Sequence, residues 1–188
     1  MVYPEKLIGT KCYLSPIGEE DAGLCAGWHN DPEVAMSLTN AHMVSTIDWE
    51  REKLKRIMQN NPHAFRIIDL KDSRIIGHTA LFEIEPVHRS GILRITIGEK
   101  KCWDSGYGTD ALRLLLDYGF NLLNLHSIAL GVIAYNMRAI KCYEKIGFRI
   151  AATKRKSKMM MGKWHNVVMM DILDSEFKSK CVKSLSNL

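Results

Sequence analysis

A glycine-containing loop, residues 103–108 (Trp-Asp-Ser-Gly-Tyr-Gly), is the segment whose residue types point most directly to a ligand. It lies between an apolar run at 92–97, typical of a strand, and a run at 109–123 with the spacing of a helix. Such a loop leaves unpaired main-chain N–H groups at the positive end of the helix dipole, and glycine lets a ligand approach the backbone closely. The segment predicts a pyrophosphate site, and a tight strand-to-helix turn without a ligand explains it equally well.

The same residues can be compared with two known phosphate motifs. A P-loop is absent, because no Gly-Lys-Ser/Thr stands four residues after a glycine. Residues 106–111 (Gly-Tyr-Gly-Thr-Asp-Ala) match the dinucleotide fingerprint in its alanine-ended form. The next expected strand, however, ends in Tyr135-Asn136 and lacks the carboxylate that would hold a ribose hydroxyl. The sequence therefore disfavours a nicotinamide enzyme.

The elements that must position this loop are strands and helices in an irregular alternation. Asp31-Pro32 is expected to end the first helix, because proline disfavours helical geometry in the residue before it. No repeat or Pro/Gly/Ser-rich linker divides the chain, so a single domain is expected over 1–188. The expected strands are 11–17, 64–70, 75–84, 92–97, 127–135, 148–157 and 164–173, and the expected helices are 18–31, 45–60, 109–123 and 137–146.

The composition is that of an ordinary globular chain. Of 188 residues, 46% are hydrophobic and 25% are charged, with 26 Lys and Arg against 21 Asp and Glu. The net charge of +5 fits a solvated basic surface better than nucleic-acid binding. The basic stretch 154–158 is expected on an edge strand, where lysines prevent pairing with another sheet, rather than in a nucleic-acid patch.

The cysteines and histidines indicate neither a disulfide framework nor a metal site. The five cysteines, at 12, 25, 102, 142 and 181, stand alone, and the histidines lack metal-ligand spacing. Reduced thiols and no metal are therefore expected. Residues 1–9 carry charges at Glu5 and Lys6 and contain no long apolar run. Neither a signal peptide nor a membrane anchor is expected, and the predicted location is the cytoplasm.

Downstream of the loop, residues 136–148 follow the pattern Asn-x-x-Ala-x-x-x-Tyr-x-x-x-Gly-Phe. At this distance from a glycine-containing loop, the pattern resembles the GNAT superfamily of acyl-CoA-dependent N-acetyltransferases. The opening at 14–33 and the tail at 162–173 are similar to the RimJ/RimL-type branch, so the resemblance spans about residues 10–175. Within that branch, two segments look most like bacterial spermidine/spermine acetyltransferases: 81–89 and 117–125.

The resemblance implies an α+β fold, with a GNAT-like mixed and mostly antiparallel sheet of about seven strands flanked by helices. It also implies an acetyl-CoA-dependent enzyme in which a primary amine attacks the acetyl thioester directly, within a ternary complex. The acceptor would be a polyamine, a protein N-terminus or an amino sugar, and a homodimer is a family expectation. A GNAT-shaped sensor that binds acyl-CoA without turnover is the alternative.

The resemblance also implies roles for individual residues. Tyr143 would protonate the departing thiolate, because a tyrosine hydroxyl, with a pKa of about 10, is protonated at neutral pH. Glu83 is the first candidate for the base, with Glu85, Glu33 and His88 as competitors. Strand 92–98 would offer main-chain groups to the pantetheine arm if it diverges from strand 127–135. The residues expected to bind the coenzyme are Thr96, Ile97, Trp103, Asp104, Ser105, Gly106, Tyr107, Gly108, Thr109 and Asn136.

The loop departs from the family pattern at two positions. Ser105 replaces a basic residue, and Asp104 adds a negative charge where phosphates would lie. Both changes should weaken coenzyme binding, and the residues that could restore the positive charge are Lys100, Lys101 and Arg138. On the acceptor side, a polyamine is slightly favoured, because four carboxylates could gather around a polycation: Asp31, Glu33, Glu83 and Glu85. The net positive charge argues weakly the other way.

Overall fold

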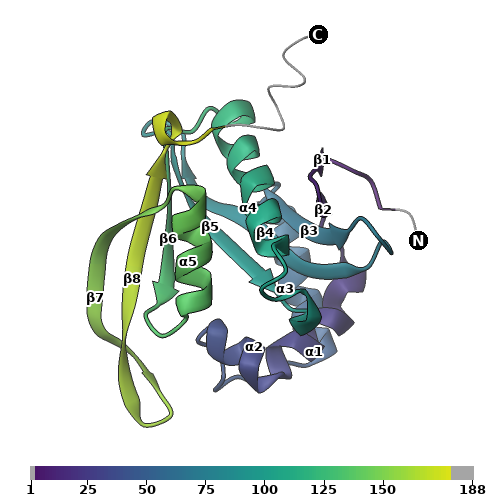
Figure 1. Ribbon diagram of the computed structural model, residues 1–188. Coiled ribbons are helices and arrows are strands. Elements are labelled where there is room, and N and C mark those ends of the chain that lie inside the picture. The colour runs from purple at the N-terminus through teal and green to yellow at the C-terminus, as the bar shows by residue number, and fades with distance from the viewer. Residues whose placement is uncertain (1–2, 179–188) are drawn as a thin grey trace.

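An eight-stranded sheet runs through the middle of the molecule in the order β1-β2-β3-β4-β5-β6-β8-β7 (Figure 1). The structure is a computed structural model, which describes residues 3–178. The strands are β1 (Leu7–Ile8), β2 (Cys12–Pro16), β3 (Ala64–Asp69), β4 (Ile75–Glu85), β5 (Ser90–Ile97), β6 (Ser127–Ile133), β7 (Arg149–Met160) and β8 (Lys163–Leu173). The helices are α1 (Ala22–Asn30), α2 (Pro32–Ser37), α3 (Ile47–Asn60), α4 (Tyr107–Asp117) and α5 (Met137–Ile146), with short turns η1 (Glu19–Asp21), η2 (Lys100–Cys102), η3 (Tyr118–Leu122) and η4 (Asp174–Glu176).

The expected α+β architecture is confirmed, with two elements added to those read from the sequence. Strand β1 has only two residues, too few to give a periodic pattern, and it pairs with β2. Helix α2 begins at Pro32, the residue that was expected only to end a helix. One helix ends and the next begins at this point, because the Asp31 side chain accepts hydrogen bonds from the N–H groups of Glu33 and Val34 and so caps α2.

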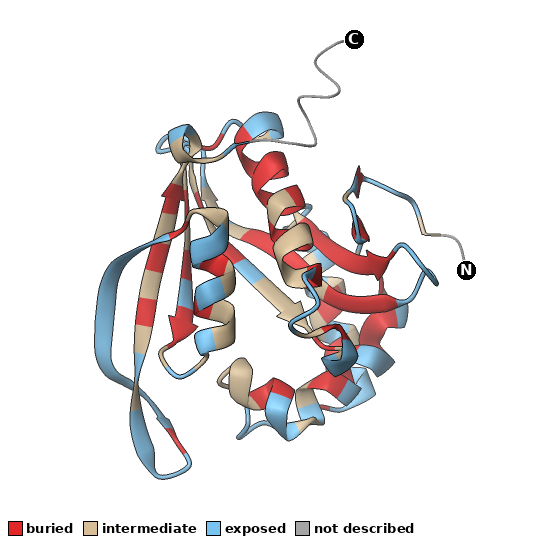
Figure 2. Cartoon of the chain, viewed as in Figure 1, coloured by how far each residue is buried: buried red, intermediate tan, exposed pale blue. Residues whose placement is uncertain are grey.

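The two faces of the sheet are covered by different helices, because side chains alternate along each strand. Leu14 and Ile67 join α4 and α5 in the larger hydrophobic cluster, whereas their neighbours Tyr13 and Ile68 face Trp28 of α1. Figure 2 shows the buried residues concentrated in the central strands and along α4. Helix α4 is therefore the main support of one face, and α1, α2 and α3 form the other layer.

The parallel pair at the centre of the sheet is short. Strands β5 and β6 pair only from Ser90 opposite Ser127 to Ile92 opposite Ala129. Beyond that point β5 stays paired with β4 as far as Ile97, and β6 stays paired with β8 as far as Ile133. The two strands therefore diverge and leave a wedge-shaped gap between their carboxyl ends, which meets the condition for strand 92–98 to offer main-chain groups to a ligand.

Strand β7 lies at the edge of the sheet, where the basic stretch 154–158 was expected. Every residue of β7 except Met160 is exposed. Lysines along such an edge discourage the addition of a strand from another molecule. Three cysteines, Cys12, Cys25 and Cys102, are free thiols buried in the core. Cys181 lies outside the described residues.

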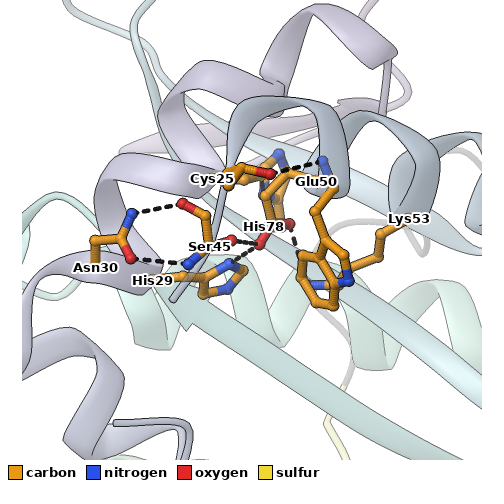
Figure 3. Close-up of polar contacts among 9 residues, drawn as sticks. Cys25, His29, Asn30, Ser45, Glu50, Lys53 and His78 are labelled. Atoms are coloured by element: carbon orange, nitrogen blue, oxygen red, sulfur yellow. Dashed lines mark hydrogen bonds and ion pairs between the residues drawn. The ribbon is translucent and has the colours of Figure 1, made fainter. Parts of the chain in front are cut away.

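A buried carboxylate joins α3 to α1 and to the segment that precedes α3 (Figure 3). Glu50 of α3 lies 2.5 Å from His29 Nδ1, 2.5 Å from Ser45 Oγ and 3.2 Å from Lys53 Nζ. Asn30 exchanges two further hydrogen bonds with the main chain of Ser45, at 2.7 and 2.9 Å. Burial alone would raise the pKa of Glu50, but these hydrogen bonds and the charge of Lys53 outweigh it and lower the pKa to about 2.

We expect Glu50→Gln to lower the free energy of unfolding at pH 7 by roughly 2–3 kcal/mol, because the folded protein favours the ionised carboxylate. The folded pKa, about 2, lies below the ordinary value of 4.5. The contribution of Glu50 is therefore complete above about pH 5 and is lost as the pH falls toward 2. Urea unfolding at pH 7, 5 and 3 measures the effect. The exposed Glu52→Gln is the control, and an equal loss of stability at pH 7 and pH 3 would contradict the assignment.

Candidate functional site

The gap between β5 and β6 exposes main-chain groups of β5 that have no strand partner. Gly98 donates to the Ile76 carbonyl of β4 at 3.0 Å. Because main-chain groups alternate in direction along a strand, those of Thr96 also face β4, whereas those of Ile97 face the gap. The Ile97 carbonyl already accepts a hydrogen bond of 2.7 Å from the Trp103 indole N–H. Of the two predicted positions, only Ile97 presents main-chain groups to the gap, and its N–H is the group left for a ligand.

The glycine loop leads from this gap into α4. Gly106 is the N-cap of α4 with a φ of +85°, a left-handed conformation that favours glycine. Asp110 N–H donates to the Gly106 carbonyl, which begins the helix. The N–H groups of Tyr107, Gly108 and Thr109 thus precede the first helical hydrogen bond and are directed out of the helix end. These three residues, all predicted from the sequence, form the amino-terminal end of α4, where a helix presents N–H donors suited to an anion.

A second contact from the first turn of α4 reaches the amino-terminal part of the chain. The Asp110 carboxylate accepts hydrogen bonds from the N–H groups of Thr10, Lys11 and Cys12 at 2.9, 2.8 and 3.1 Å. This contact holds the turn between β1 and β2 against the loop, with the Lys11 ammonium 5.5 Å from the centre of the Tyr107 ring. Sequence reasoning missed Lys11, because nothing local in the sequence connects it with a loop almost 100 residues later.

Tyr143 lies on α5 and is 9% exposed. Its ring packs edge-on against Phe148 at 5.8 Å, which explains the spacing of the Tyr-x-x-x-Gly-Phe pattern. Burial raises the pKa of Tyr143, so the hydroxyl stays protonated. No residue between 3 and 178 forms a hydrogen bond with that hydroxyl, which leaves it available as a donor.

Asn136 caps α5. Its side-chain oxygen accepts a hydrogen bond of 3.2 Å from the Ala139 N–H, which explains the Asn-x-x-Ala spacing in structural terms. Its side-chain NH₂ group remains for a ligand. Asn136 therefore combines the structural role of an N-cap with a donor at the wide end of the gap.

Glu83, the first candidate for the base, lies at the other end of β5. It occupies a bulge of β4 with a φ of +48°, its side chain is 66% exposed, and the nearest cation is Arg94 at 4.0 Å. Its position is level with the paired end of β5 and β6 rather than with the wide end of the gap. Among its competitors, Glu33 lines a cavity, and Glu85 is paired with Ser90 at the start of β5. The identity of the base stays a prediction.

The four carboxylates expected to surround a polycation do not gather. Asp31 and Glu33 each lie 2.7 Å from the Lys100 ammonium, just beyond the end of β5. Glu83 and Glu85 lie at the start of β5, a strand of eight residues, so the two pairs are separated by roughly 25 Å. The Lys100 ammonium, a candidate for binding phosphate, instead forms ion pairs with the Asp31 and Glu33 carboxylates.

A cavity of about 290 Å³ lies between α2 and the start of α5, at the wide end of the gap. The Tyr135 hydroxyl donates to the Met36 carbonyl at 2.7 Å and ties its two walls together. On the inner side, the Arg138 guanidinium stacks 3.5 Å from the centre of the Trp103 ring. The lining residues are Glu33, Met36 and Ser37 from α2, and Tyr135, Asn136, Met137 and Arg138 from the β6–α5 junction.

A cysteine, a histidine and an aspartate also meet beneath α1. Cys25 Sγ lies 3.6 Å from His78 Nδ1, and His78 Nε2 lies 3.1 Å from Asp21 (Figure 3 shows Cys25 and His78). The order resembles a nucleophilic triad, but Cys25 is only 3% exposed. Burial, with the charges of nearby Glu50 and Asp21, raises the pKa of Cys25 to about 12. The thiol is therefore protonated and inaccessible, and the cluster supports the fold.

Metal and membrane features are absent from the described part of the chain. Within residues 3–178, no group of three or more His, Cys, Asp or Glu is placed to hold a metal ion. Among the helices of the same residues, none has the length and apolarity needed to cross a bilayer.

Solved structures with the same fold include two bacterial acetyltransferases. A spermidine N-acetyltransferase from Vibrio cholerae, in complex with CoA and spermine, has a TM-score of 0.80 at 25% identity, over 88% of this chain and 96% of that one. An acetyltransferase of the GNAT family from Bacillus anthracis has a TM-score of 0.78 at 20% identity, over 90% of this chain and 99% of that one. The GNAT fold expected from the sequence is confirmed.

Sequence relatives agree with the fold. A probable N-acetyltransferase, YjcK, of Bacillus subtilis (strain 168) is 29% identical over 90% of this chain and 98% of its own length. The spermidine N(1)-acetyltransferase of Vibrio cholerae is 31% identical over 67% of this chain and 72% of its own length. The family described as "Acetyltransferase (GNAT) domain" matches residues 11–149. The chain therefore belongs to the GNAT acetyltransferase family and is an N-acetyltransferase.

Proposed function

We propose that this enzyme transfers the acetyl group of acetyl-CoA to a primary amine by direct attack within a ternary complex. The observation that carries the proposal is the early end of the parallel pairing between β5 and β6, beside the free N–H groups of α4 and the buried Tyr143. A relative of the same fold was solved with CoA and spermine, which supports a coenzyme and an amine as the two substrates.

The coenzyme would lie along the gap. Its pyrophosphate would accept hydrogen bonds from the N–H groups of Tyr107, Gly108 and Thr109, with the segment from Trp103 to Gly106 curving around it. An amide carbonyl of the pantetheine arm would accept from the Ile97 N–H, while the Asn136 amide donates from the opposite wall. These roles rest on the orientation of the groups in the gap.

The reaction requires the amine nitrogen to lose one proton and the thiolate sulfur to gain one. The neutral amine nitrogen attacks the carbonyl carbon of the thioester, a C–N bond forms and the C–S bond breaks. A base takes the proton from the amine nitrogen, and Glu83 acting through water, or Glu33 beside the cavity, would fill that role. The Tyr143 hydroxyl gives its proton to the departing thiolate sulfur and regains one from solvent.

The finer assignments belong to the same proposal. Three relatives carry the name spermidine N(1)-acetyltransferase, which supports a polyamine among the three proposed acceptors, a polyamine, a protein N-terminus and an amino sugar. The RimJ/RimL-type branch and a cytoplasmic location stay predictions. The alternative, a non-catalytic acyl-CoA sensor suggested by Asp104 and Ser105, is not supported by the relatives, which carry the names of N-acetyltransferases.

We expect Tyr143→Phe to lower kcat by about 10²–10⁴-fold, the usual contribution of a positioned acid, with little change in the Kd of acetyl-CoA. The thiolate charge develops only as the C–S bond breaks, so the loss falls on kcat. Steady-state thiol release and calorimetric titration measure the two quantities.

The control for this variant is Tyr118→Phe, which removes a hydroxyl that hydrogen-bonds to His63 in the same core at 2.8 Å. It should lower the melting temperature without changing kcat. If Tyr143→Phe also keeps the wild-type kcat and only lowers the melting temperature, Tyr143 is a packing residue and not the acid.

Substitution of Gly108 tests the pyrophosphate site. An added Cβ at Gly108 would meet only Cys142 Sγ and Ile97 Cγ1, both at an ordinary 3.8 Å, so Gly108→Val should fold. A branched side chain there should obstruct the approach to the main chain and raise the Kd of acetyl-CoA by about tenfold or more. Ser105→Lys should lower that Kd by adding a positive charge. Unchanged Kd values in both variants would defeat the placement of the pyrophosphate.

A further inference from the structure

The charges around the cavity between α2 and α5 do not suit a polycation. Glu33 is the acidic side chain in its wall, and its Oε2 lies 2.7 Å from the Lys100 ammonium. The same ammonium lies 2.7 Å from Asp31, so one lysine serves both carboxylates. An incoming ammonium group would have to displace Lys100 before it could bind there.

The opposite wall carries a cation without a counter-charge. Arg138 is partly buried, and no carboxylate between residues 3 and 178 pairs with it. Its guanidinium carbon lies over the Trp103 ring, 3.5 Å from the centre, and its N–H groups form no hydrogen bond with another described residue. A partly buried guanidinium with free N–H groups is suited to a carboxylate, which it can bind through two parallel hydrogen bonds.

Trp103 connects Arg138 to the layer of α1 and α2. The indole packs against the cluster of Trp28 and Val34, which belongs to the layer of α1 and α2. The free N–H groups of α4 lie at the start of a helix that packs in the cluster on the other face of the sheet. Arg138 is therefore held in the wall of the cavity, next to the layer of α1 and α2, while its helix α5 contacts the first turn of α4 through Cys142 and Thr109.

We propose that the acceptor is a small primary amine that carries a carboxylate, such as an amino acid or a close analogue, and that Arg138 binds this carboxylate. This inference rests on the proposed function. The four charged groups of the cavity region, Asp31, Glu33, Lys100 and Arg138, balance, so a polyamine gains no net attraction there. A zwitterion fits this balance, with its carboxylate on Arg138 and its amine directed into the gap. The cavity volume of about 290 Å³ suits a small molecule.

Thiol release with acetyl-CoA tests the proposal on the wild-type enzyme, against a panel of amino acids, the corresponding amino acid amides, short peptides and spermidine. We expect kcat/KM for at least one amino acid to exceed that for its amide and for spermidine by roughly 10–100-fold, the value of a charge-assisted hydrogen bond. Comparing kcat/KM for the free amino acids with kcat/KM for the short peptides shows whether the preferred carboxylate belongs to a free amino acid or to the carboxyl terminus of a peptide. A higher kcat/KM for spermidine than for every carboxylate-bearing amine overturns the proposal.

Arg138→Gln should lower kcat/KM for the preferred amino acid by a similar 10–100-fold and leave the amide almost unchanged. Lys141→Gln removes an exposed charge from the same helix outside the cavity and should have no effect on either. Lys100→Met should free Asp31 and Glu33 and raise kcat/KM for spermidine several-fold. Equal losses for the amino acid and its amide in Arg138→Gln, with a raised Kd of acetyl-CoA, would assign Arg138 to the coenzyme and overturn the proposal.

The same measurements separate this proposal from the proposed function. An enzyme that binds acetyl-CoA and acetylates spermidine best refutes only the carboxylate assignment. A chain that neither binds acetyl-CoA by calorimetry nor releases thiol with any amine refutes both.

Discussion

The early end of the parallel pairing between β5 and β6 is the constraint on which the rest of the structure depends. Each strand keeps a full antiparallel partner on its other side, β4 for β5 and β8 for β6, so the divergence costs few main-chain hydrogen bonds. Main-chain groups that face a gap without a partner are costly to bury. In this chain the Trp103 indole satisfies the Ile97 carbonyl, and a ligand with amide groups can satisfy others.

Contacts between segments far apart in the sequence surround the gap. Asp110 holds the β1–β2 turn against the glycine loop, Tyr135 joins the start of α5 to α2, and Lys100 joins η2 to α2. Arg138 and Trp103 close the inner side of the cavity by stacking. None of these contacts belongs to regular secondary structure, yet together they determine the shape of the site and the charge that a substrate meets.

Local patterns in the sequence predicted seven of the eight strands, the glycine loop and the α5 motif, because periodicity and capping are properties of neighbouring residues. Local patterns could not predict the side-chain contacts between distant segments. Lys11 reaches the loop only through the β1–β2 turn, and Glu83 adopts a positive φ in a bulge that alternation does not reveal. The expected cluster of four carboxylates failed for the same reason, since their spacing along the chain says nothing of Lys100 between two of them.

The hydrogen bonds of Asp110 make the turn between the first two strands a support for the glycine loop. Three consecutive N–H groups, from Thr10 to Cys12, end on one carboxylate in the first turn of α4. A fusion partner or a shortened amino terminus would therefore act on the loop directly, although almost 100 residues separate them. For expression and engineering, a tag after η4 would be farther from the loop, because Phe177 packs on Phe120 of η3, which follows the opposite end of α4.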